Sequence, residues 1–176
     1  MSSLKTWAAA AAMVALTGAA QAALVSNPDS TVTDTNTNLI WLQHWNVNKL
    51  HDWSTQKDWA ETALDGFAGS NDWVLPSISQ YAGLFAAYGD LTLVSQFLDV
   101  QSDAYWSGTE YAQFPARAWY FSSFDGPQYI FDKDFAMYAV AVRPGDVAAS
   151  VPEPQTLALV LLALGATVVA RRRRPA

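Results

Sequence analysis

The last 26 residues of the chain contain three blocks with different chemical character. Their pattern indicates that this end of the chain is not part of a globular core. The first block is an extended, proline-rich motif, Val151, Pro152, Glu153 and Pro154. Residues 156–170 follow as an uncharged and mostly apolar segment. The final block is a basic cluster, Arg171, Arg172, Arg173 and Arg174. We therefore divide the C-terminal end into a motif, an apolar segment and a basic tail.

The apolar segment has the character of a short transmembrane helix. A helix over the 15 residues 156–170 would be about 22 Å long. The hydrocarbon core of a bilayer is about 30 Å thick, and arginine side chains that reach the interface reduce the difference. Four arginines beside a span favour a cytoplasmic location for that end. We expect the preceding domain to lie on the outer side of the membrane.

The N-terminal end predicts export. Within residues 1–22 the only charged side chain is Lys5, and an apolar stretch covers residues 7–16. Ala20, Gln21 and Ala22 form a small-residue cleavage site. This pattern is typical of a secretory signal peptide that is removed after Ala22.

The middle of the chain, residues 23–150, has 128 residues and no cysteine. It is long enough for one domain with one core, and that core cannot depend on disulfides. It contains five of the ten basic residues and fifteen of the sixteen acidic ones, so its formal net charge is near −10. Nucleic acid is excluded as a partner, because phosphate binding requires clustered Lys and Arg. The acidity favours solubility or weak divalent-cation binding.

The pattern of hydrophobic residues predicts an α+β domain over residues 31–145, between a leader at 23–30 and a linker at 146–150. We expect a helix from Ser54 or Thr55 to about Leu64 and another that begins after Ser77 and ends at Gly89. The first helix is expected to bury Trp59, Ala63 and Phe67, and a short third helix is expected over residues 91–98. The expected strands are residues 31–33, 39–42, 104–107, 118–122, 129–131 and 137–143, with a hairpin turn at Gly126 and Pro127 between two of them.

Two aromatic motifs, at residues 73–77 and 105–110, favour a structural role over a binding role. In an extended segment, one face of the chain presents alternate residues, so Trp73 and Leu75 point to the core while Val74 points away. Pro76 keeps Leu75 extended before the second helix. The residues that we assign to this architecture are Trp73, Leu75, Pro76, Tyr105, Trp106, Ser107, Thr109 and Glu110.

The sequence of the domain is compatible with three kinds of functional site. Trp45 and Trp53 lie in a polar stretch and are the candidates for stacking on sugars, although both rings also suit a core. Aspartates in loops are candidates for calcium, although such residues are more often solvated turns. The calcium candidates are Asp99, Asp103, Asp132 and Asp134. A carboxylate-pair hydrolase would use Glu61 or Glu110 with an aspartate. No other catalytic pattern and no required cofactor is predicted.

The three C-terminal blocks resemble the PEP-CTERM sorting signal. This resemblance implies recognition by an exosortase, a membrane enzyme that removes or exchanges the tail. It also implies a location at the cell surface or in the extracellular matrix, in bacteria that build exopolysaccharide and biofilm.

Residues 32–143 resemble the Lcl C-terminal-like domain family. The resemblance rests on two motifs, Trp73-Val74-Leu75-Pro76-Ser77 and Tyr105-Trp106-Ser107-Gly108-Thr109-Glu110. The family is similar to the C-type-lectin-like and formylglycine-generating-enzyme fold, and this implies two main helices and a strand-rich C-terminal half. Val74 stands where the family has arginine, Gly108 where it has serine, and the family's cysteines are missing.

Together the two resemblances imply an exported, non-enzymatic protein with an interaction or adhesion role in exopolysaccharide or biofilm. Its expected partners are the exosortase, the membrane before processing, and extracellular polysaccharide. A calcium-assisted, lectin-like glycan-binding module is the first alternative. A hydrolase acting on polysaccharide is the second.

Overall fold

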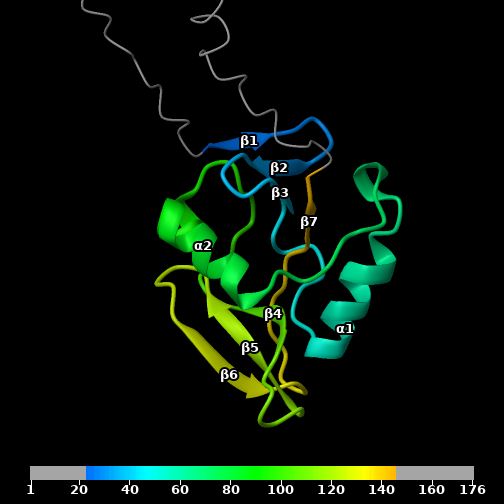
Figure 1. The fold of residues 1–176 in the computed structure, drawn as a ribbon, viewed down its shortest axis with the longest axis vertical. Coiled ribbons are helices and arrows are strands. Elements are labelled where there is room, and N and C mark those ends of the chain that lie inside the picture. The colour runs from blue at the N-terminus through cyan, green and yellow to red at the C-terminus, as the bar shows by residue number, and fades with distance from the viewer. Residues whose placement is uncertain (1–22, 146–176) are drawn as a thin grey trace, which may run out of the picture.

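A computed structural model describes residues 23–145 of the protein (Figure 1). The predicted signal peptide at residues 1–22, the linker at 146–150 and the sorting tail at 151–176 lie outside the described residues. Within residues 23–145, no helix combines the length and the apolar character that crossing a membrane requires. The predicted transmembrane segment is not part of this range.

The first of two antiparallel sheets holds both ends of the described chain. It has the order β1 (Leu24–Ser26), β2 (Thr31–Asp34), β3 (Leu39–Leu42) and β7 (Val142–Pro144). The carbonyl of Ala23 accepts a 3.0 Å hydrogen bond from the N–H of Thr35, and the N–H of Gly145 donates to the carbonyl of Asn38 at 2.8 Å. The two ends are therefore fastened on either side of one turn. The leader predicted at residues 23–30 was wrong, because three of its residues form the edge strand β1.

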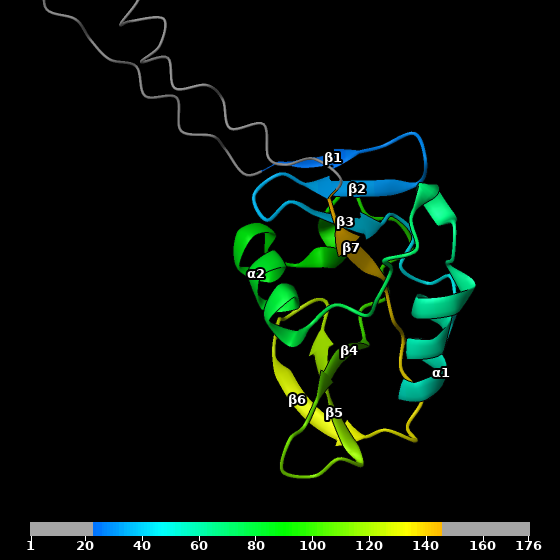
Figure 2. The same ribbon diagram turned by 45° about the vertical axis from the view of Figure 1, so that its right-hand side comes forward.

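The second sheet has the order β4 (Ala104–Glu110), β5 (Arg117–Ser122) and β6 (Gln128–Asp132). Figures 1 and 2 both show it at the end of the molecule opposite β1 and β2. The predicted turn at Gly126 and Pro127 joins β5 to β6, and Gly126 has a positive φ of 86°. The α+β class and the strand-rich C-terminal half are confirmed, and the relation to C-type lectins stays a prediction.

The predicted strand at residues 137–143 is mostly an extended segment that changes partner along its length. Met137 bridges to His51, Tyr138 to Tyr105 and Val142 to Val74, and only β7 forms part of a sheet. This segment runs through the centre of the molecule and connects the two sheets. A regular strand has only two edges, so over its length it pairs with only two neighbouring strands. The segment at residues 137–143 contacts more neighbours than that because its partners change along its length.

The first helix, α1 (Trp53–Asp58), continues through a π-helical turn at Trp59–Ala63. Its N-cap is Asp52, which accepts a 2.9 Å hydrogen bond from the N–H of Thr55. Hydrogen bonds from the Ser54 hydroxyl and from this N–H lower the pKa of Asp52 to about 2. The predicted cap at Ser54 or Thr55 was wrong, because both residues donate to Asp52 instead of capping.

The predicted inner face of this helix was also wrong in part. Trp59 and Phe67 are half-buried, but Ala63 is exposed. The helix widens at the π-helical turn, and the extra residue in that turn rotates the buried face of the residues that follow. The side chains that α1 and its continuation bury are Trp53, Gln56, Ala60 and Leu64.

The second helix, α2 (Ile78–Tyr88), follows the prediction closely. Ser77 and Gln80 form a reciprocal capping box, and Gly89 ends the helix with a φ of 72°. Tyr81 and Leu84 are buried, with Phe85 packed beside them. The predicted third helix at 91–98 is only a 3-10 turn at Leu91–Leu93, which Asp90 caps.

The core lies between the helices and the two sheets and is built largely from aromatic rings. Trp45 is central to it, with its ring centroid 4.9 Å from Phe97, 5.3 Å from Tyr105 and 6.0 Å from Trp41. Tyr81 of α2 stacks on Phe121 of β5 at 4.8 Å. The chain has no cysteine, so this aromatic packing stabilises the core without disulfides.

Two glycines near α2 provide a matched test of this packing. Gly126→Ala is expected to destabilise the domain by about 1–3 kcal/mol, since alanine is strained at positive φ. A Cβ at Gly126 would also lie 2.5 Å from Cε1 of Phe85. Gly83→Ala, inside α2 with nothing within 4 Å of its Cβ, is expected to stabilise by about 0.5–1 kcal/mol. Urea denaturation of both variants measures the difference, and equal effects would contradict the close approach at Gly126.

Candidate functional site

The sheet of β4, β5 and β6 has two faces that its pairing register defines. Residues directly opposite each other on antiparallel strands point to the same side. Tyr120 is opposite Trp106 on β4 and Tyr129 on β6, and Ala118 is opposite Phe131. One face therefore carries Trp106, Tyr120, Tyr129 and Phe131. The other carries Phe121, which packs against α2.

The first of these faces is a continuous row of aromatic rings. Tyr120 lies 6.4 Å from Trp106, 5.8 Å from Tyr129 and 6.4 Å from Phe131 between ring centroids. Phe135, from the loop after β6, lies 4.8 Å from Phe131. We call these five residues the aromatic face.

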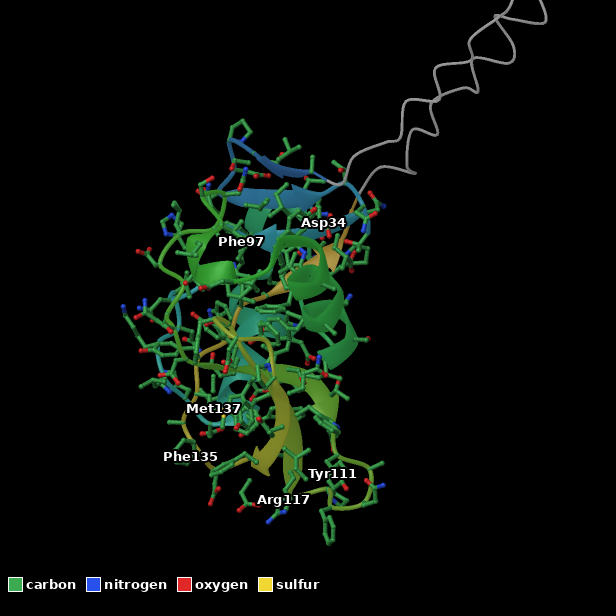
Figure 3. The ribbon with its side chains drawn as sticks, turned by 90° about the vertical axis from the view of Figure 1, so that its left-hand side faces the viewer. Asp34, Phe97, Tyr111, Arg117, Phe135 and Met137 are labelled. Carbon is green, nitrogen blue, oxygen red and sulfur yellow. The ribbon has the colours of Figure 1, made fainter. Side chains whose placement is uncertain are left out.

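The outer part of the aromatic face is open to solvent. Tyr129 is 55 % exposed, Phe131 41 % and Phe135 52 %, while Tyr120 is half-buried. Folded proteins rarely leave neighbouring large apolar side chains exposed unless the surface binds something. Figure 3 shows Phe135 toward the end of the molecule away from Asp34, which belongs to the sheet with the chain ends. The aromatic face therefore lies at the end of the molecule away from both ends of the described chain.

The inner part of the face is held rigidly. Trp106 is fully buried, and its indole N–H donates to the carbonyl of Phe135 at 3.3 Å. Lys133, between the two exposed phenylalanines, forms an ion pair with Glu110 at 2.9 Å. Its ammonium group also lies 4.1 Å from the centroid of the Trp53 ring. These contacts fix the loop that carries Phe135.

The face carries no ionised group of its own. Burial, and secondly the neighbouring Tyr129, raise the pKa of Tyr120. The hydroxyl of Tyr120 therefore remains protonated at neutral pH and can both donate and accept a hydrogen bond. A surface of neutral rings with phenolic hydroxyls suits an uncharged, hydroxyl-rich ligand better than an ion.

Comparison with known protein families agrees with this architecture. Residues 30–143 match the profile of the Lcl C-terminal domain, which is more than half of the chain. The chain belongs to the Lcl C-terminal domain family. Residues 150–174 match the PEP-CTERM protein-sorting motif. The protein is thus exported, recognised by an exosortase, and located at the cell surface or outside the cell after processing. No curated protein matches the chain.

The two motifs that carry the family resemblance lie against each other in this Lcl C-terminal domain. The N–H of Gly108 donates to the carbonyl of Pro76 at 2.8 Å, and the hydroxyl of Thr109 accepts from the N–H of Ile78 at 3.0 Å. A Cβ at Gly108 would lie 2.9 Å from the carbonyl oxygen of Leu75. The serine that the family has at this position would require the two segments to move apart.

The other motif residues contribute to the core or fix its loops. Trp73, Leu75 and Tyr105 are buried, while Val74 points away and is exposed. The hydroxyl of Ser107 donates to the carbonyl of Trp119 at 2.7 Å. Glu110 forms an ion pair with Lys133 at 2.9 Å. These placements support the structural interpretation of both motifs.

Neither tryptophan predicted to stack on sugars has an accessible ring, so this prediction requires correction. Trp45 is fully buried in the centre of the core. Trp53 is 6 % exposed, its indole N–H donates to the carbonyl of Ser107 at 2.7 Å, and Lys133 covers its ring. A sugar cannot reach either ring without unfolding the domain.

The four aspartates predicted as calcium candidates have separate surroundings. Asp99 contacts His44 at 2.8 Å, Asp103 accepts from the N–H of Ala104 at 2.7 Å, and Asp132 pairs with Arg117 at 2.7 Å. Asp134 is exposed. Over residues 23–145 the structure brings no three acidic, histidine or cysteine side chains together as metal ligands.

The sequence did not predict the aromatic face as a binding surface. Of its five residues, only Trp106 was singled out, and it was assigned a structural role. A signal was available at Tyr129 and Phe131. They alternate within a predicted strand, so they had to share one side of the sheet. Phe135 gave no such signal, because it follows the strand in an irregular loop.

Proposed function

We propose that the protein is a non-enzymatic adhesion protein that binds uncharged polysaccharide of the extracellular matrix through its aromatic face. The exposed row of Tyr129, Phe131 and Phe135 carries this proposal. The C–H faces of sugars pack on aromatic rings, and tyrosine hydroxyls add hydrogen bonds at the edge of such a surface. The ring contacts within the face, at centroid distances of 4.8–6.4 Å, extend over several rings and therefore suit a chain ligand better than a single small molecule.

The electrostatics of the domain support an uncharged ligand. Residues 23–150 carry a formal net charge near −10 from fifteen acidic and five basic residues. A polyanion would be repelled by this field at low ionic strength. An uncharged chain would meet no such repulsion and would need only the apolar contact that the aromatic face offers.

The surroundings of the two glutamates in the domain favour binding over hydrolysis. Glu61 forms an ion pair with Lys57 at 2.7 Å, and Glu110 forms one with Lys133 at 2.9 Å. Hydrolysis of a glycoside requires a pair of carboxyl groups that flank the scissile bond, and the charged partner of each glutamate is a lysine. This observation supports a non-enzymatic role.

Binding is tested with the full chain, purified in detergent, and with uncharged polysaccharide prepared from an exopolysaccharide matrix. The double variant Phe131→Ala and Phe135→Ala is expected to weaken binding at least tenfold, about 1.4 kcal/mol. Thermal stability should change little, because both side chains are substantially exposed. Affinity electrophoresis or calorimetry provides the measurement.

Phe124→Ala is the matched control, because Phe124 is exposed in the turn between β5 and β6. It should bind like the unchanged protein. Chelation of calcium should leave the affinity unchanged, since no carboxylate belongs to the aromatic face. Equal binding by the double variant and the control would reject the aromatic face as the binding surface.

A further inference from the structure

Within residues 23–145, the outer edge of β6 pairs with no other strand. The N–H of Lys133 donates to the carbonyl of Ala116, and Pro127 accepts from the N–H of Ser122. In an antiparallel ladder such bonded pairs alternate, so Tyr129 and Phe131 direct their backbone groups toward β5. Gln128, Ile130 and Asp132 therefore direct theirs away from the sheet.

The opposite edge of the same sheet is covered, which makes the β6 edge distinctive. On β4, the N–H of Trp106 donates to Tyr138 and the N–H of Gly108 donates to Pro76. Among the outward backbone groups of β6, only the carbonyl of Asp132 has a backbone partner within residues 23–145, the N–H of Phe135 at 3.1 Å. Soluble proteins usually protect such an edge with charges or proline within the strand. The only charge in β6 is Asp132, which Arg117 neutralises.

We propose that this edge pairs antiparallel with β6 of a second copy of the chain. The register that uses the unpaired outward backbone groups places Ile130 opposite the partner's Ile130, on a twofold axis, and Gln128 opposite the partner's Asp132. The Ile130 pair exchanges two N–H···O=C bonds, and the N–H of each Asp132 donates to the carbonyl of the partner's Gln128. The Asp132 carbonyl keeps its bond from the N–H of Phe135. The result is one sheet continuous across the two copies.

The side chains fit this register on both faces. Tyr129 lies opposite the partner's Phe131, which joins the two aromatic faces into one surface. On the other face the amide of Gln128 meets the carboxylate of the partner's Asp132, as donor and acceptor. No two like charges lie directly opposite each other. Most other registers either leave outward backbone groups unpaired or place Asp132 beside its own copy.

The pairing also sets the relative direction of the two copies. Figures 1 and 2 show β6 running away from the sheet that contains both chain ends. A twofold axis perpendicular to the sheet reverses the strand, so the attachment ends of the two copies point in opposite directions. Such a pair connects two facing surfaces and not two neighbours on one surface. The inference thus adds a homophilic partner to the proposed polysaccharide ligand.

The absence of cysteine in the chain allows a direct test with single-cysteine variants of the full chain in detergent. Ile130→Cys is expected to form a disulfide-linked dimer under mild oxidation, because Cα atoms of a bonded antiparallel pair are about 5.5 Å apart, within disulfide range. Leu93→Cys, at a site that is 80 % exposed outside the edge, is the control. Dimer formation at Ile130→Cys should be at least about tenfold faster; equal rates overturn the proposal.

A charge exchange at the same position tests the symmetry. Ile130→Lys and Ile130→Glu are each expected to be monomeric by sedimentation, because like charges would lie directly opposite. An equimolar mixture is expected to dimerise, and a mixture that stays monomeric overturns the register. Polysaccharide binding by the monomeric variants is measured in parallel. If the monomeric variants still bind polysaccharide, the loss of strand pairing is distinguished from a loss of binding by the aromatic face.

Discussion

Replacing Trp45 with alanine is expected to lower the free energy of unfolding by about 3–5 kcal/mol. The side chain is fully buried, and its ring contacts Trp41, Phe97 and Tyr105 at centroid distances of 6.0, 4.9 and 5.3 Å. Domains of this size are usually stable by only about 5–15 kcal/mol. The variant should therefore lose a large fraction of its stability.

Equilibrium urea denaturation followed by tryptophan fluorescence measures this effect. Val47→Ala, an exposed aliphatic residue in the same loop, is the control and should change stability by less than about 0.5 kcal/mol. A Trp45→Ala variant that keeps its stability and loses only polysaccharide binding would restore the stacking role predicted from the sequence.

Neutralising the basic cluster at the C-terminus is expected to abolish most exosortase processing. Replacement of Arg171, Arg172, Arg173 and Arg174 with glutamine removes the charges that orient the apolar segment. Each arginine near an anionic leaflet contributes about 1 kcal/mol, so roughly 4 kcal/mol of membrane attraction is lost. The precursor should accumulate uncut, which immunoblotting of cell fractions detects.

Two controls make this experiment specific. Replacement of all four arginines with lysine keeps the charge and should keep processing. Lys49→Gln changes a charge within the folded domain and should have no effect on sorting. Normal cleavage of the glutamine variant would contradict the role assigned to the basic cluster within the PEP-CTERM motif at residues 150–174.

The sequence predicted those elements whose local signals are strong. The strand at Leu39–Leu42 and the capped helix after Ser77 were placed correctly, since an apolar run and a capping residue act within a few positions. The hairpin turn at Gly126 and Pro127 was equally clear. The family assignment also held, because the motifs at residues 73–77 and 105–110 lie within the matched region.

The failures occurred where distant residues decide the outcome. The segment at residues 137–143 looks like a regular strand, but it bridges to His51, Tyr105 and Val74 in turn. Trp45 lies among polar neighbours in the sequence, and only the tertiary structure places it beside Phe97. Phe135 joins the aromatic face only because the loop folds back onto Phe131. No periodicity in a single sequence encodes such contacts.

The fastening of the chain at Gly145 has a mechanical consequence. The strand that ends there, β7, lies lengthwise against β3, with Val142 opposite Trp41 and Pro144 opposite Leu39. A force applied between the aromatic face and Gly145 would act along β7. The hydrogen bonds between β7 and β3 are then sheared together and are not peeled apart one after another. A domain loaded in this way resists pulling more than its three-residue terminal strand suggests.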